Sequence, residues 1–267
     1  MPTDNDLADH ADGVLLFSDV LGGGIYRWSP ASGVTNVVPK RRGVGGLALH
    51  ADGGVVVTGR DLQHVTGSDT RTLLLLEGAT GFNDMTTDGD GSVYLGALRF
   101  NPFAGETPVP GDIWRVDAAG TATKLFGDIE WPNGIGLSPD GNTIYACDYA
   151  AEHVVAYDLD SSGEAMDRRI FAKPESGSTD GLAVDVEGGV WVALASAGGI
   201  GRYSADGALD EIIDVPAGFV TSLCFGGADG RDLFITTMDN SEDAERRATV
   251  FATRAAVAGL PRPLATI

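Results

Sequence analysis

The sequence predicts an all-β protein, a six-bladed β-propeller with four-stranded antiparallel blades, formed as a single domain by residues 1–267. Three observations predict this fold: six carboxylate-Gly turn pairs recur at a regular spacing along the chain, β-forming runs flank these six pairs, and helical periodicity is nearly absent. Successive copies lie 40, 38, 50, 47 and 42 residues apart, near the roughly 40–50 residues of one propeller blade. The six pairs are Asp12-Gly13, Asp52-Gly53, Asp90-Gly91, Asp140-Gly141, Glu187-Gly188 and Asp229-Gly230.

Each copy carries its elements in the same order. The carboxylate-Gly turn suits a hairpin between antiparallel strands, because Gly accepts a positive φ and Asp tolerates it. Short alternating runs precede the turn at 46–50, 85–89, 134–138, 181–185 and 222–226, and β-forming runs follow it at 55–59, 92–96, 143–148, 190–194 and 233–237. A third strand is expected at 24–30, 112–120, 153–160 and 199–207. An irregular β-sandwich is the alternative, but similar periods along the whole chain favour the propeller.

Composition limits the partners. The chain holds 38 acidic and 18 basic residues and a formal charge of −20, which repels phosphate backbones and anionic lipid heads, so we expect no nucleic-acid or membrane partner. Cys147 and Cys224 each lie in an apolar run and are expected to be buried free thiols. No apolar stretch is long enough to span a bilayer, and the N-terminus is polar. We expect a soluble, cytoplasmic protein, a monomer or weak homo-oligomer, that acts on a small molecule.

The repeat also predicts a site. In a propeller the first strand of every blade lines the central channel, so equivalent positions form a ring. The residues seven before each turn carboxylate are Asn5, Gly45, Asn83, Asn133, Asp180 and Ser222. Asn and Asp are poor strand formers, and either residue before Gly also forms ordinary turns, yet Asn83, Asn133 and Asp180 occupy one repeat phase in three consecutive blades. Their amide and carboxylate oxygens, without thiolate or imidazole, suit a hard divalent cation.

Three segments resemble a known family. FNDM (82–85), WPNGIGLSPDGNTIYACD (131–148) and TDGLAVDVEGGVWVA (179–193) look, in this order, like the SMP-30/gluconolactonase/luciferin-regenerating-enzyme family, and the likeness extends over nearly the whole chain. The resemblance implies a six-bladed propeller and a metal-dependent hydrolase of sugar lactones and related esters. Carried over by motif, it implies that Asn83, Asn133 and Asp180 surround the metal, the same three residues that the repeat selects.

Blade one departs from the family pattern. Members usually bring a glutamate in a Glu-Gly-Pro segment before the first turn, whereas NDLADHADG (5–13) stands here. Alignment on FSD (17–19) puts Asp6 at the place of that glutamate, although the strict repeat register selects Asn5. Three alternatives stay open: Asp6 is the fourth ligand, the start is placed late, or this member binds metal poorly or not at all. The family's closing strand is missing too, and PRPLATI (261–267) is a candidate to close the ring.

The predicted chemistry follows from this ligand set. We expect one divalent cation, Ca²⁺ first, with Zn²⁺, Mn²⁺, Mg²⁺ or Fe as alternatives, to polarise a lactone carbonyl and acidify a bound water. Asp180 is the carboxylate that both the repeat register and the family motif place on the ring. It is the predicted catalytic residue that orients or deprotonates that water. The expected function is a metal-dependent hydrolase that opens a sugar or small aliphatic lactone at the channel mouth. The alternatives are a non-catalytic ligand- or protein-binding propeller with a degenerate metal site, and a non-hydrolytic isomerase or cyclase.

Loops on the same face are expected to contact the substrate. The longest insertion, residues 97–111, is rich in Pro and Gly and is the predicted lid of the channel mouth. The predicted substrate-binding residues are Arg99, Phe100, Phe103, Trp131, Asp148, Tyr149 and His153. Each of these side chains also has an ordinary structural interpretation, as a solvated loop residue, a turn cap or a packing residue.

Overall fold

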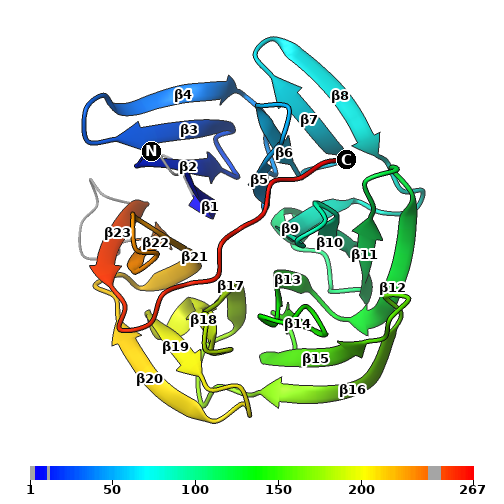
Figure 1. The fold of residues 1–267 in the computed structure, drawn as a ribbon, viewed down its shortest axis with the longest axis vertical. Helices are drawn as coiled ribbons and strands as arrows, with labels where there is room; N and C mark the ends of the chain where they lie inside the picture. Colours follow the sequence, from blue (N-terminus) through cyan, green and yellow to red (C-terminus); the bar gives the residue numbers. More distant parts are fainter. Residues whose placement is uncertain (1–3, 11–12, 240–247) are drawn as a thin grey trace.

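The computed structural model is a six-bladed β-propeller, which confirms the predicted fold (Figure 1). It describes the backbone of residues 4–10, 13–239 and 248–267, and the side chains of 13–238 and 248–267. Blades one to three contain β1 (Asp4–His10), β2 (Val14–Asp19), β3 (Gly24–Ser29) and β4 (Gly33–Pro39); β5 (Leu47–Leu49), β6 (Val55–Val57), β7 (Leu62–Thr66) and β8 (Asp69–Leu74); and β9 (Gly81–Thr87), β10 (Val93–Leu98), β11 (Gly111–Val116) and β12 (Ala122–Ile129).

The other three blades follow the same plan. They contain β13 (Pro132–Leu137), β14 (Thr143–Asp148), β15 (His153–Leu159) and β16 (Ala165–Ala172); β17 (Thr179–Val184), β18 (Val190–Leu194), β19 (Gly199–Tyr203) and β20 (Leu209–Asp214); and β21 (Phe219–Gly226), β22 (Asp232–Asp239) and β23 (Thr249–Arg254). Five sheets have four strands in sequence order, and the sixth has three within the described part of the chain rather than the expected four. Single 3-10 turns, η1 (Pro102–Ala104) and η2 (Ala195–Ala197), follow β10 and β18.

The predicted turns join the first and second strand of each blade. All six turn glycines have a left-handed φ, between 68° and 86°. Side chains just before the turn satisfy its backbone donors. Asp185 Oδ1, for example, accepts hydrogen bonds from the amides of Glu187 and Gly189 at 2.9 and 2.8 Å. The Gly of the repeat therefore marks the hairpins because the turn needs a left-handed residue, while a nearby side chain such as Asp185 serves as the local acceptor.

The first strand of each blade is its inner strand. Neighbouring inner strands contact each other all round the ring, from β1 through β5, β9, β13, β17 and β21 back to β1. Each inner strand runs from one face of the ring, here called the site face, to its hairpin turn on the opposite face, here called the turn face. Apolar clusters fill the spaces between blades. Ile113 and Ile129 of blade three, for example, pack with Ile135 and Ile144 of blade four.

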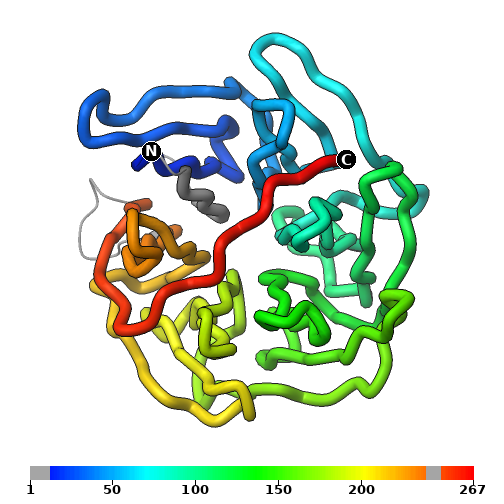
Figure 2. Tube along the Cα trace, in the orientation of Figure 1, coloured from blue at the N-terminus to red at the C-terminus, as the bar shows by residue number. Residues whose placement is uncertain are grey.

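Blades one and six meet at a seam. Among the described side chains, the buried cluster there contains Leu15, Phe17 and Cys224, and a groove of about 400 Å³ opens beside it. Cys224 and Cys147 are both buried free thiols, as predicted. Residues 261–267 join neither flanking sheet. They belong to a longer segment, residues 255–267, here called the strap, which crosses the middle of the ring on the turn face (Figures 1 and 2).

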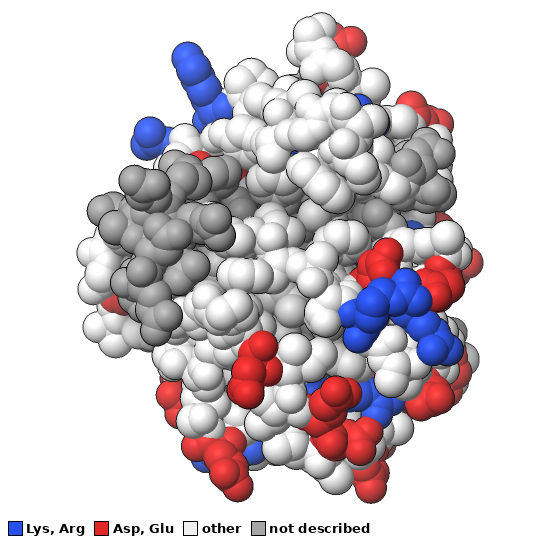
Figure 3. All heavy atoms as spheres, turned by 90° about the vertical axis from the view of Figure 1, so that its left-hand side faces the viewer, with Lys and Arg blue, Asp and Glu red and all other residues white. Residues whose placement is uncertain are grey.

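The surface carries the expected excess of negative charge. Figure 3 shows one side of the ring, where acidic side chains outnumber basic ones. The described residues include no helix that is long and apolar enough to cross a membrane.

Candidate metal and catalytic site

The predicted ring residues share one backbone irregularity. In four blades the register between the inner strand and its neighbour shifts by one residue, so two residues of the inner strand lie opposite one. The pairs and the residues they oppose are Asn5-Asp6 and Ser18, Asn83-Asp84 and Gly96, Asn133-Gly134 and Cys147, and Asp180-Gly181 and Ala193. A bulge of this kind bends the strand and redirects its side chains, which is why bulges recur beside active sites. All four predicted ligand positions are therefore structurally equivalent.

The inner strands approach closely at this level. The side-chain amide of Asn83 donates a hydrogen bond to the carbonyl oxygen of Pro132 at 2.9 Å. A Cβ atom added to Gly134 would lie 2.5 Å from the carbonyl oxygen of Asp180. One added to Gly45, the ring position of blade two, would overlap Oδ1 of Asn83. Glycines beside the ring residues therefore allow the bulges of successive blades to approach each other. Asn83 contacts the residue before Asn133, and Asn133 contacts Asp180.

Asp180 is the buried acid of this group. Asn133 and Asp180 are 6% and 5% exposed. Burial raises the pKa of Asp180 well above its ordinary value, against a smaller lowering by a hydrogen bond from Asn133. Burial and the charges of Asp180 and Asp84 likewise raise the pKa of the Cys147 thiol, so both carboxyl groups act on the same buried region. The environment of Asp180 disfavours a carboxylate that has no cation beside it.

The blade-one position is described only as backbone. Asn5 and Asp6 occupy the bulge of β1, between the pairs that Asp4 and Leu7 form with β2. Their side chains lie outside the described residues. The ambiguity between Asn5 and Asp6 has a structural origin, because a bulge places two residues where the repeat register allows one.

Aromatic side chains gather beside the ring on the same face. Trp131 and Tyr149 lie with ring centroids 4.4 Å apart, and Phe100 meets Trp131 edge-on at 5.3 Å. Burial, and then the charge of Asp180, raise the pKa of Tyr149, so its phenol lies within electrostatic range of the ring. Phe100 is 2% exposed and packs against Trp131. These residues form an aromatic wall next to Asp180.

The 97–111 insertion is held to blade three by charge. Asp112 accepts a hydrogen bond from Arg99 Nε at 3.1 Å and forms an ion pair with Lys124. Burial raises the pKa of Asp112, but hydrogen bonds from Lys124 and Arg99 outweigh burial and hold that pKa below its ordinary value. Phe103, in η1, is 58% exposed. Arg99 is thus engaged within the loop, and Phe103 projects from it.

Asp148 and His153 lie at the site-face end of blade four. Asp148 is buried and accepts hydrogen bonds from the backbone amides of Glu130 at 2.9 Å and Trp131 at 3.1 Å. His153 places Nδ1 3.1 Å from the carbonyl oxygen of Ala151, and among the described residues its buried Nε2 has no hydrogen-bond partner. Asp148 therefore fixes the segment that leads into the aromatic wall and Asn133.

Sequence reasoning missed several supporting residues. Thr179 donates to the carbonyl oxygen of His153 at 3.0 Å and ties β17 to blade four beside Asp180. Thr58 accepts hydrogen bonds from the amides of Gly45 and Gly46 at 3.2 and 2.7 Å, which orders the ring position of blade two. The available signal for these residues was a polar side chain close to a repeated glycine. Their hydrogen-bond partners lie far away in the sequence, so the contacts themselves could not be predicted.

The donor set fits a hard cation. No group of three or more His, Cys, Asp or Glu suited to a metal occurs among the described side chains. Asn83, Asn133 and Asp180 supply amide and carboxylate oxygens, which suit Ca²⁺ and similar ions. The buried carboxyl group of Asp180 favours a bound cation, because a cation beside it would offset the free-energy cost of ionising that carboxyl group.

The chain has clear relatives. Residues 5–239 match the family described as SMP-30/Gluconolactonase/LRE-like region. The chain is 32% identical over 266 residues to 6-deoxy-6-sulfogluconolactonase of Pseudomonas putida, across 94% of this chain and 90% of that protein. It is 29% identical over 235 residues to pentonolactonase XacC of Haloferax volcanii, across 86% and 79% of the two chains.

A solved structure agrees with these sequence matches. The structure of a calcium-binding protein, regucalcin, from Agrobacterium tumefaciens has a TM-score of 0.85 and 26% identity to this chain, covering 99% of this chain and 94% of that one. The resemblance that the motifs carry is therefore confirmed, and the chain belongs to the SMP-30/gluconolactonase/LRE-like family.

Proposed function

We propose that this protein is a metal-dependent lactonase that opens a sugar or small aliphatic lactone at the site face of the channel. The observation that carries the proposal is the meeting of Asn83, Asn133 and Asp180 on equivalent bulges beside a buried carboxyl group. The names of its relatives support the reaction class, because 6-deoxy-6-sulfogluconolactonase and pentonolactonase both denote lactone opening. The regucalcin neighbour, named a calcium-binding protein, supports Ca²⁺ as the first ion to test.

Asn83, Asn133 and Asp180 would hold the cation, with Asp6 as the proposed fourth ligand. When bound, a divalent cation supplies Lewis acidity for the lactone carbonyl and its developing negative charge. Asp180 is the proposed base, because burial raises the pKa of its carboxyl group and so makes the carboxylate more basic than an exposed one. Asn133 holds that carboxylate in place through its hydrogen bond.

The other predicted substrate contacts divide by position. Trp131 and Tyr149 would form the wall against which the lactone ring packs, with Phe100 holding Trp131 in place. Phe103 would cover the mouth from the insertion, while Arg99 would fix the base of that loop through Asp112. Asp148 and His153 would position the segment that leads to Asn133.

The test is a lactone panel followed with a pH indicator. The wild-type protein should acidify the solution when divalent cations are present and lose this activity in a chelator, with recovery on adding back Ca²⁺, Mn²⁺, Mg²⁺ or Zn²⁺. Asp180→Asn should lower turnover by at least about 100-fold, the scale of losing an acid-base group, and Asn133→Ala should also lower turnover because it removes a proposed cation ligand. Asp140→Asn, which alters an exposed turn on the opposite face, is the control and should keep full turnover. Absence of lactone opening with every cation would refute the proposal.

A further inference from the structure

Among the described strands, the first and last blades of the ring do not share a sheet. Blade one is built from β1–β4 and blade six from β21–β23, in sequence order, within the described residues. The seam between them contains the small cluster of Leu15, Phe17 and Cys224 and the adjoining groove. β1 also contacts β21 and β22 at this seam. The strap adds a second set of contacts, across the middle of the ring.

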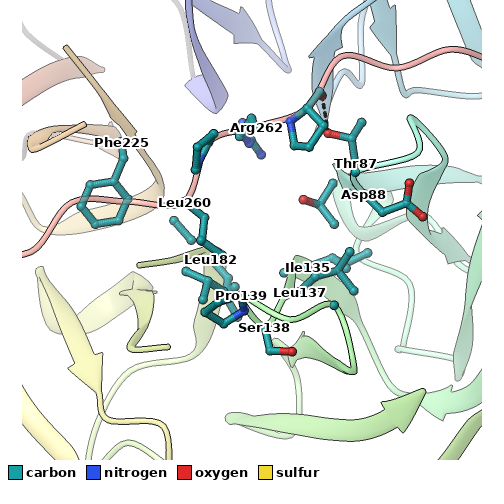
Figure 4. Close-up of a pocket in the computed structure, with 18 of the residues that line it drawn as sticks. Thr87, Asp88, Ile135, Leu137, Ser138, Pro139, Leu182, Phe225, Leu260 and Arg262 are labelled. Atoms are coloured by element: carbon teal, nitrogen blue, oxygen red, sulfur yellow. Dashed lines mark hydrogen bonds between the residues drawn. The ribbon is translucent and has the colours of Figure 1, made fainter. Parts of the chain in front are cut away.

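The strap begins on blades six and five. The amide of Gly259 donates to the carbonyl oxygen of Gly230, on the turn of blade six, at 2.8 Å. The next amide, that of Leu260, donates to the carbonyl oxygen of Val184, at the end of β17, at 2.9 Å. The side chain of Leu260 packs into the cluster that contains Leu182, and Figure 4 shows both side chains at the edge of a cavity of about 460 Å³.

The strap ends on blades three and two. Thr87, at the end of β9, donates its hydroxyl to the carbonyl oxygen of Pro263 at 2.6 Å, the bond drawn dashed in Figure 4. The amide of Ala265 donates to the carbonyl oxygen of Leu49 at 2.8 Å. The side chains of Ala265 and Ile267 are both buried among those of blades two and three. The strap therefore spans the channel and fastens blades on opposite sides of it.

The same strands carry the proposed metal site at their other ends. Thr87 lies four residues after Asn83 in β9, and Val184 lies four residues after Asp180 in β17. Four strand residues span about 13 Å, so each strap contact lies about that far from its ring residue along a continuous strand. A link that fixes the separation of β9 and β17 at the turn face would also restrain it at the site face.

We propose that the strap braces the ring across its channel and positions the metal site from the opposite face. The strap acts as a cross-brace between β9 and β17, and its residues are positioning residues that touch neither substrate nor cation. The part of this inference that concerns cation affinity rests on the proposed function. The part that concerns restraint of the two strands stands on the contacts alone.

The experiment compares two Thr→Val variants. Thr87→Val deletes the hydroxyl that binds the strap, while Thr237→Val deletes a buried hydroxyl that bonds the Thr249 backbone within blade six. Hydrogen exchange of the amides of residues 81–84 and 179–182 is measured by mass spectrometry, and Ca²⁺ affinity by calorimetry. Arg71→Met, which removes a donor to the Ile267 oxygen at 2.9 Å, is a second strap variant in case Thr87→Val fails to fold.

Strap variants should speed exchange at both ring segments by about 3- to 10-fold, the scale of one lost hydrogen bond, and weaken Ca²⁺ binding by a similar factor. The Thr237→Val control should change neither. The inference is overturned if exchange rises only near the strap and Ca²⁺ affinity stays within twofold of wild type. A wild-type protein that binds no cation and opens no lactone would refute the proposed function, while exchange at the ring segments would still decide whether the strap restrains β9 and β17.

Discussion

Replacing Asp180 by Asn should stabilise the cation-free protein while removing its response to cation. Asp180 is 5% exposed in the wild type, and among the described residues Asn133 supplies the hydrogen bond that offsets the burial of its carboxyl group. Removing a charge that is buried with so little compensation should raise the free energy of unfolding at pH 7 by about 1–3 kcal/mol. With cation at 100 times its Kd, wild type should gain about 2.7 kcal/mol, or about 5–10 °C in Tm, and the variant should gain almost nothing.

The pH dependence of this difference follows from the sign of the pKa shift. Because the folded pKa of Asp180 is raised, the carboxyl group is protonated in both folded and unfolded states below about pH 4, and the variant should have no advantage there. Wild-type stability should then fall relative to Asp180→Asn as the pH rises toward the folded pKa. The assay is thermal and urea unfolding from pH 4 to 8 in chelator, then with Ca²⁺.

Asp148→Asn is the matched control for this experiment. Asp148 is as buried as Asp180, but its oxygens accept hydrogen bonds from the Glu130, Trp131 and Ala151 backbone amides. An amide nitrogen in place of one oxygen would face these donors and should cost about 1–3 kcal/mol, the opposite sign from Asp180→Asn. If Asp180→Asn proves less stable than wild type in chelator, or keeps the full cation-induced shift in Tm, the assignment of Asp180 as an uncompensated ligand is wrong.

Two further substitutions test the packing and the charge around the site. Gly134→Ala should lower the free energy of unfolding, measured in urea, by about 1–3 kcal/mol and weaken cation binding, because the added Cβ would lie 2.5 Å from the Asp180 carbonyl oxygen. Gly89→Ala is the control, because Gly89 has open space around it. Equal losses of stability in the two variants would contradict the close approach at Gly134. Asp112→Asn should lower stability by about 1–2 kcal/mol near neutral pH, since the Asp112 pKa is held down. That loss should disappear as the pH falls below the ordinary carboxyl range, and a loss that persists in acid would count against the ion pairs with Arg99.

The ring could be predicted from the sequence because its physical cause repeats. Each hairpin needs a left-handed glycine and a local acceptor, so the turn leaves the same trace in every blade, and counting back from it reaches one position on every inner strand. The count reached Asn83, Asn133 and Asp180 without any knowledge of their contacts. At Asn5 and Asp6 it became ambiguous, because the register alone does not show that two residues share the bulge.

The contacts that the strap makes with the blades could not be predicted from the sequence, for the opposite reason. Residues 255–267 form bridges and single hydrogen bonds rather than a strand, and Val184, Leu49 and Gly230 receive them through backbone carbonyl oxygens, which every residue type offers. A contact between main-chain groups leaves no compositional signal at either partner. The side chains of Thr87 and Arg71 also bind the strap, but they do so at its backbone oxygens. Side-chain chemistry at a repeated position can therefore be found by counting, whereas a brace made of main-chain bonds becomes visible only once the ring has been assembled in three dimensions.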